Sequence, residues 1–235
     1  MTLRRLLAAF SIPAAILSAA SVAGAQSGPS APRPARFEVN AGLLLVGGAT
    51  LGSQTGSLTA NDPGAPGYTL FRTSTDIGAG TGVEARIGVA LTRALSIEGS
   101  GSWARQQATT FITGDAEGAA ATSATATLDT YQLEGAAVIH FNGARFAGGR
   151  GVPFVLAGGG YRRQLDDVQI LVATGGYVTA GGGVKYYFVE RPKRRMKRLG
   201  LRVDGRLTSG SGVFDPQGDG SRTTWSALTA LVVGL

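Results

Sequence analysis

The sequence predicts an all-β fold, an eight-stranded antiparallel up-and-down transmembrane β-barrel. Three observations predict it. Apolar and polar residues alternate with a period of two through most of the chain, and no stretch has a convincing helical period. Long polar connections alternate with short ones, as they do in transmembrane barrels. Charged residues make up only 16% of the chain, below the ~25% that is usual for soluble domains.

The N-terminal segment, 1–25, is expected to be a signal peptide. Arg4 and Arg5 precede an apolar run over 6–20, and Ala23-Gly24-Ala25 resembles a cleavage site before Gln26. A transmembrane helix is the competing interpretation, but Pro13 interrupts the run and it falls short of the ~20 apolar residues that a span needs. We therefore expect cleavage near Ala25, followed by a flexible Ser/Pro/Ala-rich linker over 26–36.

The barrel domain is expected over 37–235. The first strand sets Phe37 and Val39 against Glu38 and Asn40. The other strands are recognised by the same alternation, except that two Gly-rich and aromatic segments, the fifth and sixth, leave their register open. The eight predicted strands are 37–45, 83–91, 95–103, 131–141, 153–162, 177–188, 199–207 and 225–235.

The connections are of two kinds. Those after the odd-numbered strands are long and rich in Gly, Ser, Thr, Asn and Asp: 46–82, 104–130, 163–176 and 208–224. Those after the even-numbered strands are shorter: 92–94, 142–152 and 190–198. Long loops on one rim and short turns on the other are typical of a barrel that crosses a bacterial outer membrane.

Alternation alone does not say whether the apolar face points outward to lipid or inward to a core. A soluble, lipocalin-like barrel has the same period with the opposite sense. Here the polar faces carry few charges, and these nearly balance, which suits a narrow lumen in which buried charges must pair. The predicted lumen charge network consists of Glu38, Glu84, Arg86, Glu98, Glu134, Lys185, Arg202, Asp204 and Arg206.

Aromatic residues gather near the ends of the predicted strands. Two such belts are typical of side chains at the membrane–water interfaces. The predicted interface aromatics are Trp103, Tyr131, Tyr161, Tyr177 and Trp225 on the long-loop rim, and Phe37, Phe141, Phe154, Tyr186 and Phe188 on the short-turn rim.

The formal net charge of +7 arises locally. The segment 190–198 holds six basic residues and one acidic residue, which equals the excess of the chain after the leader. Nucleic-acid binding needs a basic face with a recognition element, so no nucleic-acid partner is expected. The segment either meets anionic lipid headgroups or is a solvated turn.

Three motifs carry a family resemblance: 153-PFVLAGGGY-161, 181-GGGVKYYF-188 and 201-LRVDGR-206. They resemble the central and late strands of the OmpA-like outer-membrane β-barrel family. The resemblance implies a small barrel. The sequence departs from the longer members of the family in that no peptidoglycan-binding domain is expected after the barrel, so their wall-anchoring role is not carried over. It also implies location in the cell outer membrane, contact with outer-membrane lipid and lipopolysaccharide, and recognition by the outer-membrane assembly machinery. Such barrels commonly end in Phe, whereas this chain ends in Leu235.

Little in the sequence suggests chemistry. His140 is the only histidine, there is no cysteine, and no serine follows His140 at a spacing that would suit a hydrolase. We therefore expect no enzyme activity, metal or cofactor. The expected role is structural or surface interaction through the long loops. A small, low-conductance pore and a soluble periplasmic ligand-binding barrel are the alternatives.

Overall fold

The computed structural model describes residues 35–58, 67–166, 170–190, 196–211 and 222–235. Within them the chain is all-β, apart from a short 3-10 turn, η4 (Asn142–Ala144). The strands are β1 (Phe37–Val46), β2 (Ala49–Leu58), β3 (Tyr68–Ile77), β4 (Gly80–Ala90), β5 (Leu95–Thr113), β6 (Thr122–His140), β7 (Gly151–Leu165), β8 (Leu171–Glu190), β9 (Arg198–Gly210) and β10 (Arg222–Gly234).

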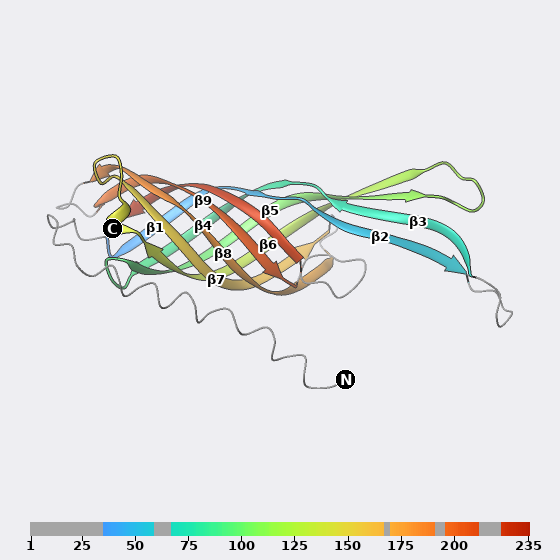
Figure 1. Cartoon of the computed structure of the whole chain (residues 1–235), viewed down its shortest axis with the longest axis horizontal. Coiled ribbons are helices and arrows are strands. Elements are labelled where there is room, and N and C mark those ends of the chain that lie inside the picture. The colour runs from blue at the N-terminus through green and yellow to red at the C-terminus, as the bar shows by residue number, and fades with distance from the viewer. Residues whose placement is uncertain (1–34, 59–66, 167–169, 191–195, 212–221) are drawn as a thin grey trace, which may run out of the picture. The chain divides into compact units, whose positions relative to one another are not determined.

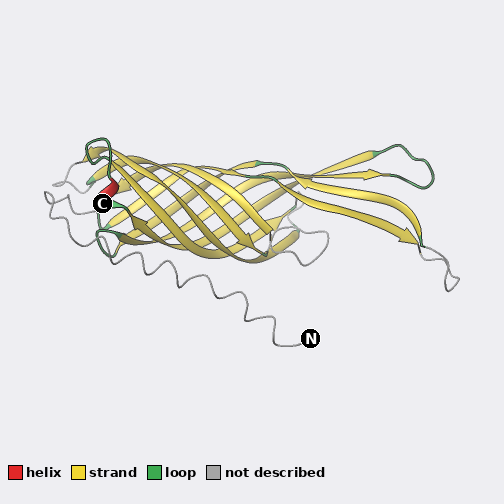
Figure 2. Cartoon of the chain, in the orientation of Figure 1, coloured by secondary structure: helices red, strands yellow, loops and turns green. Residues whose placement is uncertain are grey.

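The strands close into a ring. All pairings are antiparallel, and they run from β1 through β4, β5, β6, β7, β8 and β9 to β10, which pairs again with β1. Figure 1 shows the tilted strands of this ring, and Figure 2 shows how little of the described chain is anything but strand. The predicted all-β, antiparallel barrel is confirmed.

The predicted count of eight strands is not confirmed, because the described residues form ten. The extra strands β2 and β3 lie in the segment 46–82, which the sequence predicts to be a loop. They form a hairpin beyond the ring, and β3 pairs with the far end of β5 from Arg72↔Thr113 to Ile77↔Ala108. Strand β2 is rich in Ser, Thr and Gly and β3 is rich in Thr, and most of their side chains are exposed or only half-buried. They therefore lack the alternation that marks a strand with one buried face.

A second predicted loop, 104–130, is also largely strand. The ladder between β5 and β6 continues from Ala104↔Thr130 to Ile112↔Thr122, so both strands extend well beyond the ring. Together with β2 and β3 they form a projecting sheet in the order β2-β3-β5-β6. Strands β7 and β8 likewise reduce the predicted loop 163–176 to the link after Leu165.

The interior of the ring is apolar at one end. Near the short turns, Val138, Phe154 and Leu156 form one buried cluster, and Val152, Tyr187 and Val232 form another. A third cluster, Leu51, Ile77, Ala108 and Leu128, lies where the projecting sheet leaves the ring. The charged residues described below lie in the ring between these two regions. Among the described residues there is no helix long and apolar enough to cross a membrane.

Candidate functional site: a charge network inside the barrel

The two faces of the ring differ sharply in polarity. On β4, Glu84 and Arg86 are buried, while Val83 before them and Ile87 after them are exposed. The same holds on β9, where Arg202, Asp204 and Arg206 are buried. The most exposed large apolar side chains include Leu43 at 71% and Leu133 at 69%. Strand geometry explains this arrangement, since successive side chains point to opposite faces.

Glu98 is the centre of the network. Its Oε2 accepts hydrogen bonds from Nη1 of Arg202 at 2.7 Å and from Nη1 of Arg86 at 3.0 Å. Its Oε1 accepts one from Nζ of Lys185 at 3.2 Å. The three cations come from β9, β4 and β8, so a single carboxylate on β5 joins strands on opposite sides of the lumen.

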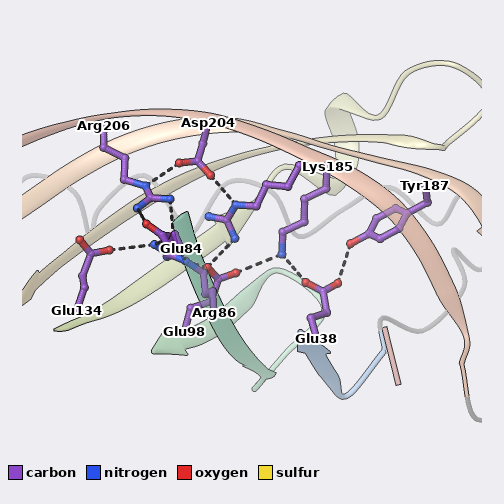
Figure 3. Close-up of polar contacts among 10 residues, drawn as sticks. Glu38, Glu84, Arg86, Glu98, Glu134, Lys185, Tyr187, Asp204 and Arg206 are labelled. Carbon is purple, nitrogen blue, oxygen red and sulfur yellow. Dashed lines mark hydrogen bonds and ion pairs between the residues drawn. The ribbon is translucent and has the colours of Figure 1, made fainter. Parts of the chain in front are cut away.

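Glu84 and Asp204 bind the remaining guanidinium group. Arg206 donates from Nη1 to Glu84 Oε2 at 2.6 Å and from Nε to Asp204 Oδ1 at 2.6 Å. Glu84 also accepts from Nη2 of Arg86 at 2.9 Å, and Arg86 reaches Glu134 at 3.2 Å. Figure 3 shows these groups as one continuous set of contacts.

Glu38 extends the network toward the short-turn end. It accepts a hydrogen bond from Lys185 and another, at 2.7 Å, from the hydroxyl of Tyr187. The structure therefore brings all nine side chains of the predicted network together in the lumen. Sequence reasoning missed Tyr187, although it lies two residues after Lys185 and so on the same face of β8.

The arrangement fills the lumen with paired charge. Five carboxylates face four cations: Glu38, Glu84, Glu98, Glu134 and Asp204 against Arg86, Lys185, Arg202 and Arg206. Buried charges are tolerated when they are paired and hydrogen-bonded. The ion pairs cross-link strands across the ring and leave the interior packed with side chains, as expected for a narrow barrel.

The predicted position at the outer surface is wrong for two of the ten interface aromatics. Phe154 and Tyr177 are 2% and 6% exposed and point into the ring. The Phe154 ring packs against the guanidinium of Arg202, 4.5 Å from its centroid, and the Tyr177 ring packs against Arg162 at 5.1 Å. A flat ring beside a desolvated cation is favourable, which explains the inward position of both.

The other predicted aromatics are exposed or half-buried on the outer surface. They lie near both ends of the ring: Trp103, Tyr131, Tyr161 and Trp225 at the end of the projecting sheet, and Phe37, Phe141, Tyr186 and Phe188 at the short-turn end.

The basic segment 190–198 is only partly described, since 191–195 lie outside the described residues. Arg198 is buried, forms an ion pair with Glu190 at 3.2 Å and lies over the Tyr187 ring. It is therefore not part of a solvated turn. The predicted signal peptide, the linker up to residue 34 and residues 212–221 of the last long loop also lie outside the described residues.

His140 lies at the end of β6, with its ring 6.2 Å from that of Phe154. It borders a small cavity of about 30 Å³ at the short-turn end, together with Ser96, Asn142 and Arg145. This volume holds little more than a water molecule. No group of three or more metal-ligating side chains occurs in the part of the chain that the structure describes.

Comparison with known proteins gives a likeness of fold. No family model matches the chain, and no curated protein matches it in sequence. The outer membrane protein OprG from Pseudomonas aeruginosa is similar in structure, with a TM-score of 0.51 and 11% identity, over 86% of this chain and 96% of OprG. Ail, the attachment invasion locus protein of Yersinia pestis, aligns over 85% of this chain and 97% of its own with a TM-score of 0.39 and 9% identity.

The likeness to OprG shows that this chain shares the fold of an outer-membrane β-barrel. The expected membership of the OmpA-like family specifically is not confirmed.

Proposed function

We propose that this chain is an integral protein of the bacterial outer membrane with a structural or surface-interaction role and no catalytic activity. One observation carries the proposal: the ring buries its charges and exposes its large apolar side chains. In water this arrangement would be unfavourable on both counts. In a lipid environment the arrangement is favourable. The closed ladder of strands pairs the backbone N–H and C=O groups, and the apolar outer face contacts hydrocarbon.

Two further features support a membrane location. Exposed aromatic side chains lie near both ends of the ring, as interfacial belts do. The fold is shared with OprG, which is described as an outer membrane protein. The soluble periplasmic barrel is not favoured, because its apolar side chains would line an interior that here holds the charge network.

The surface role belongs to the projecting sheet in this proposal. The sheet β2-β3-β5-β6 extends from the rim of the long connections, and its exposed side chains include many Ser and Thr residues together with Leu58, Tyr68, Phe71 and Phe111. Loops and extensions held on a rigid scaffold commonly carry recognition. The alternative of a small pore finds no support in the lumen, where the ion pairs of Glu98 and Glu84 span the ring.

Cell fractionation combined with a gel-mobility assay tests the proposal. The full chain is expressed in a Gram-negative host, membranes are separated by density, and the protein is run in mild detergent with and without boiling. We expect the protein in the outer-membrane fraction, with a change in mobility on boiling as the barrel unfolds. Recovery in the soluble periplasm without a mobility change would overturn the proposal.

A further inference from the structure

A groove of about 1000 Å³ lies on the outer surface of the ring, across β1, β4, β5, β6 and β7. Its floor is made of small residues on three adjacent strands, since Ala41 pairs with Ala85 and Ala85 with Gly101. Leu133 and Tyr161 continue the same row and form a wall. Pockets of roughly 300–1,000 Å³ hold drug-sized ligands, so the groove is large enough for a substantial apolar group.

The small residues of the floor lie next to the aromatic belt, on its short-turn side. The next outward-facing row toward the projecting sheet runs from Val83 through Trp103 and Tyr131 to Arg163, each paired with the next. Trp103, Tyr131 and Arg163 all line the groove. Aromatic side chains of this kind lie at the level of lipid headgroups in membrane proteins.

Arg163 gives the groove a charged end. Its side chain is exposed, and within the described residues it has no hydrogen bond or ion pair to another side chain. The neighbouring Arg105 differs, because its guanidinium binds both carboxylate oxygens of Asp129, at 2.9 and 3.0 Å. As far as the structure describes the chain, the groove therefore combines an apolar floor with one guanidinium that has no ion pair, at the expected level of the headgroups.

We propose that this groove binds an acyl chain of a phosphorylated glycolipid of the outer leaflet, with Arg163 bound to the phosphate. The inference rests on the proposed location in the outer membrane. Guanidinium groups bind phosphate through two parallel hydrogen bonds. Small residues allow close packing, and in lipid, where all tails are equally apolar, such packing decides which surfaces associate. Charge complementarity thus selects an anionic lipid, and the groove orders one of its chains.

Two substitutions remove the two halves of the site separately. Gly101→Leu fills the groove, and its Cβ would lie 3.6 Å from Cδ2 of Leu133, an ordinary contact. Arg163→Gln removes the charge and keeps the groove. Gly205→Leu is the matched control: it adds the same side chain to an exposed position on β9, where a Cβ meets nothing within 4 Å.

The experiment is native mass spectrometry of the four purified proteins in non-ionic detergent, titrated with purified lipid A or with dephosphorylated lipid A. We expect one lipid A bound to the wild type and to Gly205→Leu with equal affinity. Binding should weaken at least tenfold in Gly101→Leu. In Arg163→Gln the preference for the phosphorylated lipid should be lost. The boiled and unboiled gel assay checks that each variant is folded.

Equal lipid A binding by all four proteins would overturn the inference while leaving the outer-membrane location intact. A homodimer that Gly101→Leu abolishes, without lipid A bound to the wild type, would assign the groove to a second copy of the chain and also overturn it. A wild type that stays in the soluble fraction and shows no mobility change would instead refute the proposed function itself.

Discussion

Replacement of Arg202 by Met tests whether the lumen network stabilises the barrel. The guanidinium is fully buried, with Nη1 2.7 Å from Glu98 and Nε 2.6 Å from Asp204. Removing one partner of a buried ion pair costs about 3–5 kcal/mol. Glu98 keeps Arg86 and Lys185 as partners, so we expect the lower end, a loss of about 3 kcal/mol in the free energy of unfolding.

Arg105→Met is the matched control for this experiment. Arg105 also binds a carboxylate with two hydrogen bonds, but its side chain is 58% exposed. Exposed pairs contribute at most about 1 kcal/mol. Both variants are unfolded in urea from detergent micelles and followed by tryptophan fluorescence, with the stability taken from the midpoint and the slope. Equal losses below about 1 kcal/mol would show that the lumen charges are solvated like surface charges, and the reasoning would be refuted.

Three further predictions concern the two faces of the ring. Phe154→Ala should lower the free energy of unfolding by about 3–5 kcal/mol, far more than the exposed Phe188→Ala in the same urea assay, and equal effects would contradict the inward position of Phe154. Val203→Arg on the outward-facing side of β9 should cost about 2–4 kcal/mol in phospholipid vesicles, whereas Ser123→Arg on the projecting part of β6 should cost little; the reverse order would mean that β9 faces water. Gly183→Ala should destabilise by about 1–3 kcal/mol, because its Cβ would lie 2.1 Å from the carbonyl oxygen of Val203, while Gly205→Ala meets nothing within 4 Å and should leave the urea midpoint unchanged.

The alternation of residue types predicts the faces of most strands. Where one face carries charges and the other carries Leu, Val or Ile, as over 83–91 and 199–207, a single assignment fits, and the structure places Glu84, Arg86, Arg202 and Arg206 inside accordingly. A shift of one residue would turn all of these charges toward the outside. The burial of these charges can therefore be predicted from the sequence, because only one register places the charged side chains inside the ring.

The same reasoning fails where both faces are apolar. Around 153–156 the inward side chains are Phe154 and Leu156, which join the apolar cluster at the short-turn end, while Val155 points outward. No polar residue breaks the run, so the alternation disappears. The register of 153–162 stays open in the sequence for this reason, and it is where Phe154 is misplaced.

The projecting strands are missed for the opposite reason. Both faces of β2 and of the far end of β6 are largely exposed and polar. Their Thr and Ser residues have no buried side to alternate with, so they are indistinguishable from a polar loop by pattern alone. The frequent Thr residues, including Thr109, Thr110 and Thr125, are the signal that could have indicated strand, because β-branched residues favour it.

The distribution of charge along the chain suggests what the network contributes to folding. The strands of the first half, β1 to β6, contribute four carboxylates and only one cation to the network: Glu38, Glu84, Glu98, Glu134 and Arg86. The strands of the second half contribute three cations and only one carboxylate: Lys185, Arg202, Arg206 and Asp204. Each half alone would carry a surplus of buried charge, and the surplus is neutralised only when the two halves face each other across the lumen. Buried ionic groups can specify register and pairing even where they add little net stability. We therefore expect closure of the ring between β1 and β10 to be coupled to pairing of these charges, because a half-formed barrel leaves many of them without a partner across the lumen.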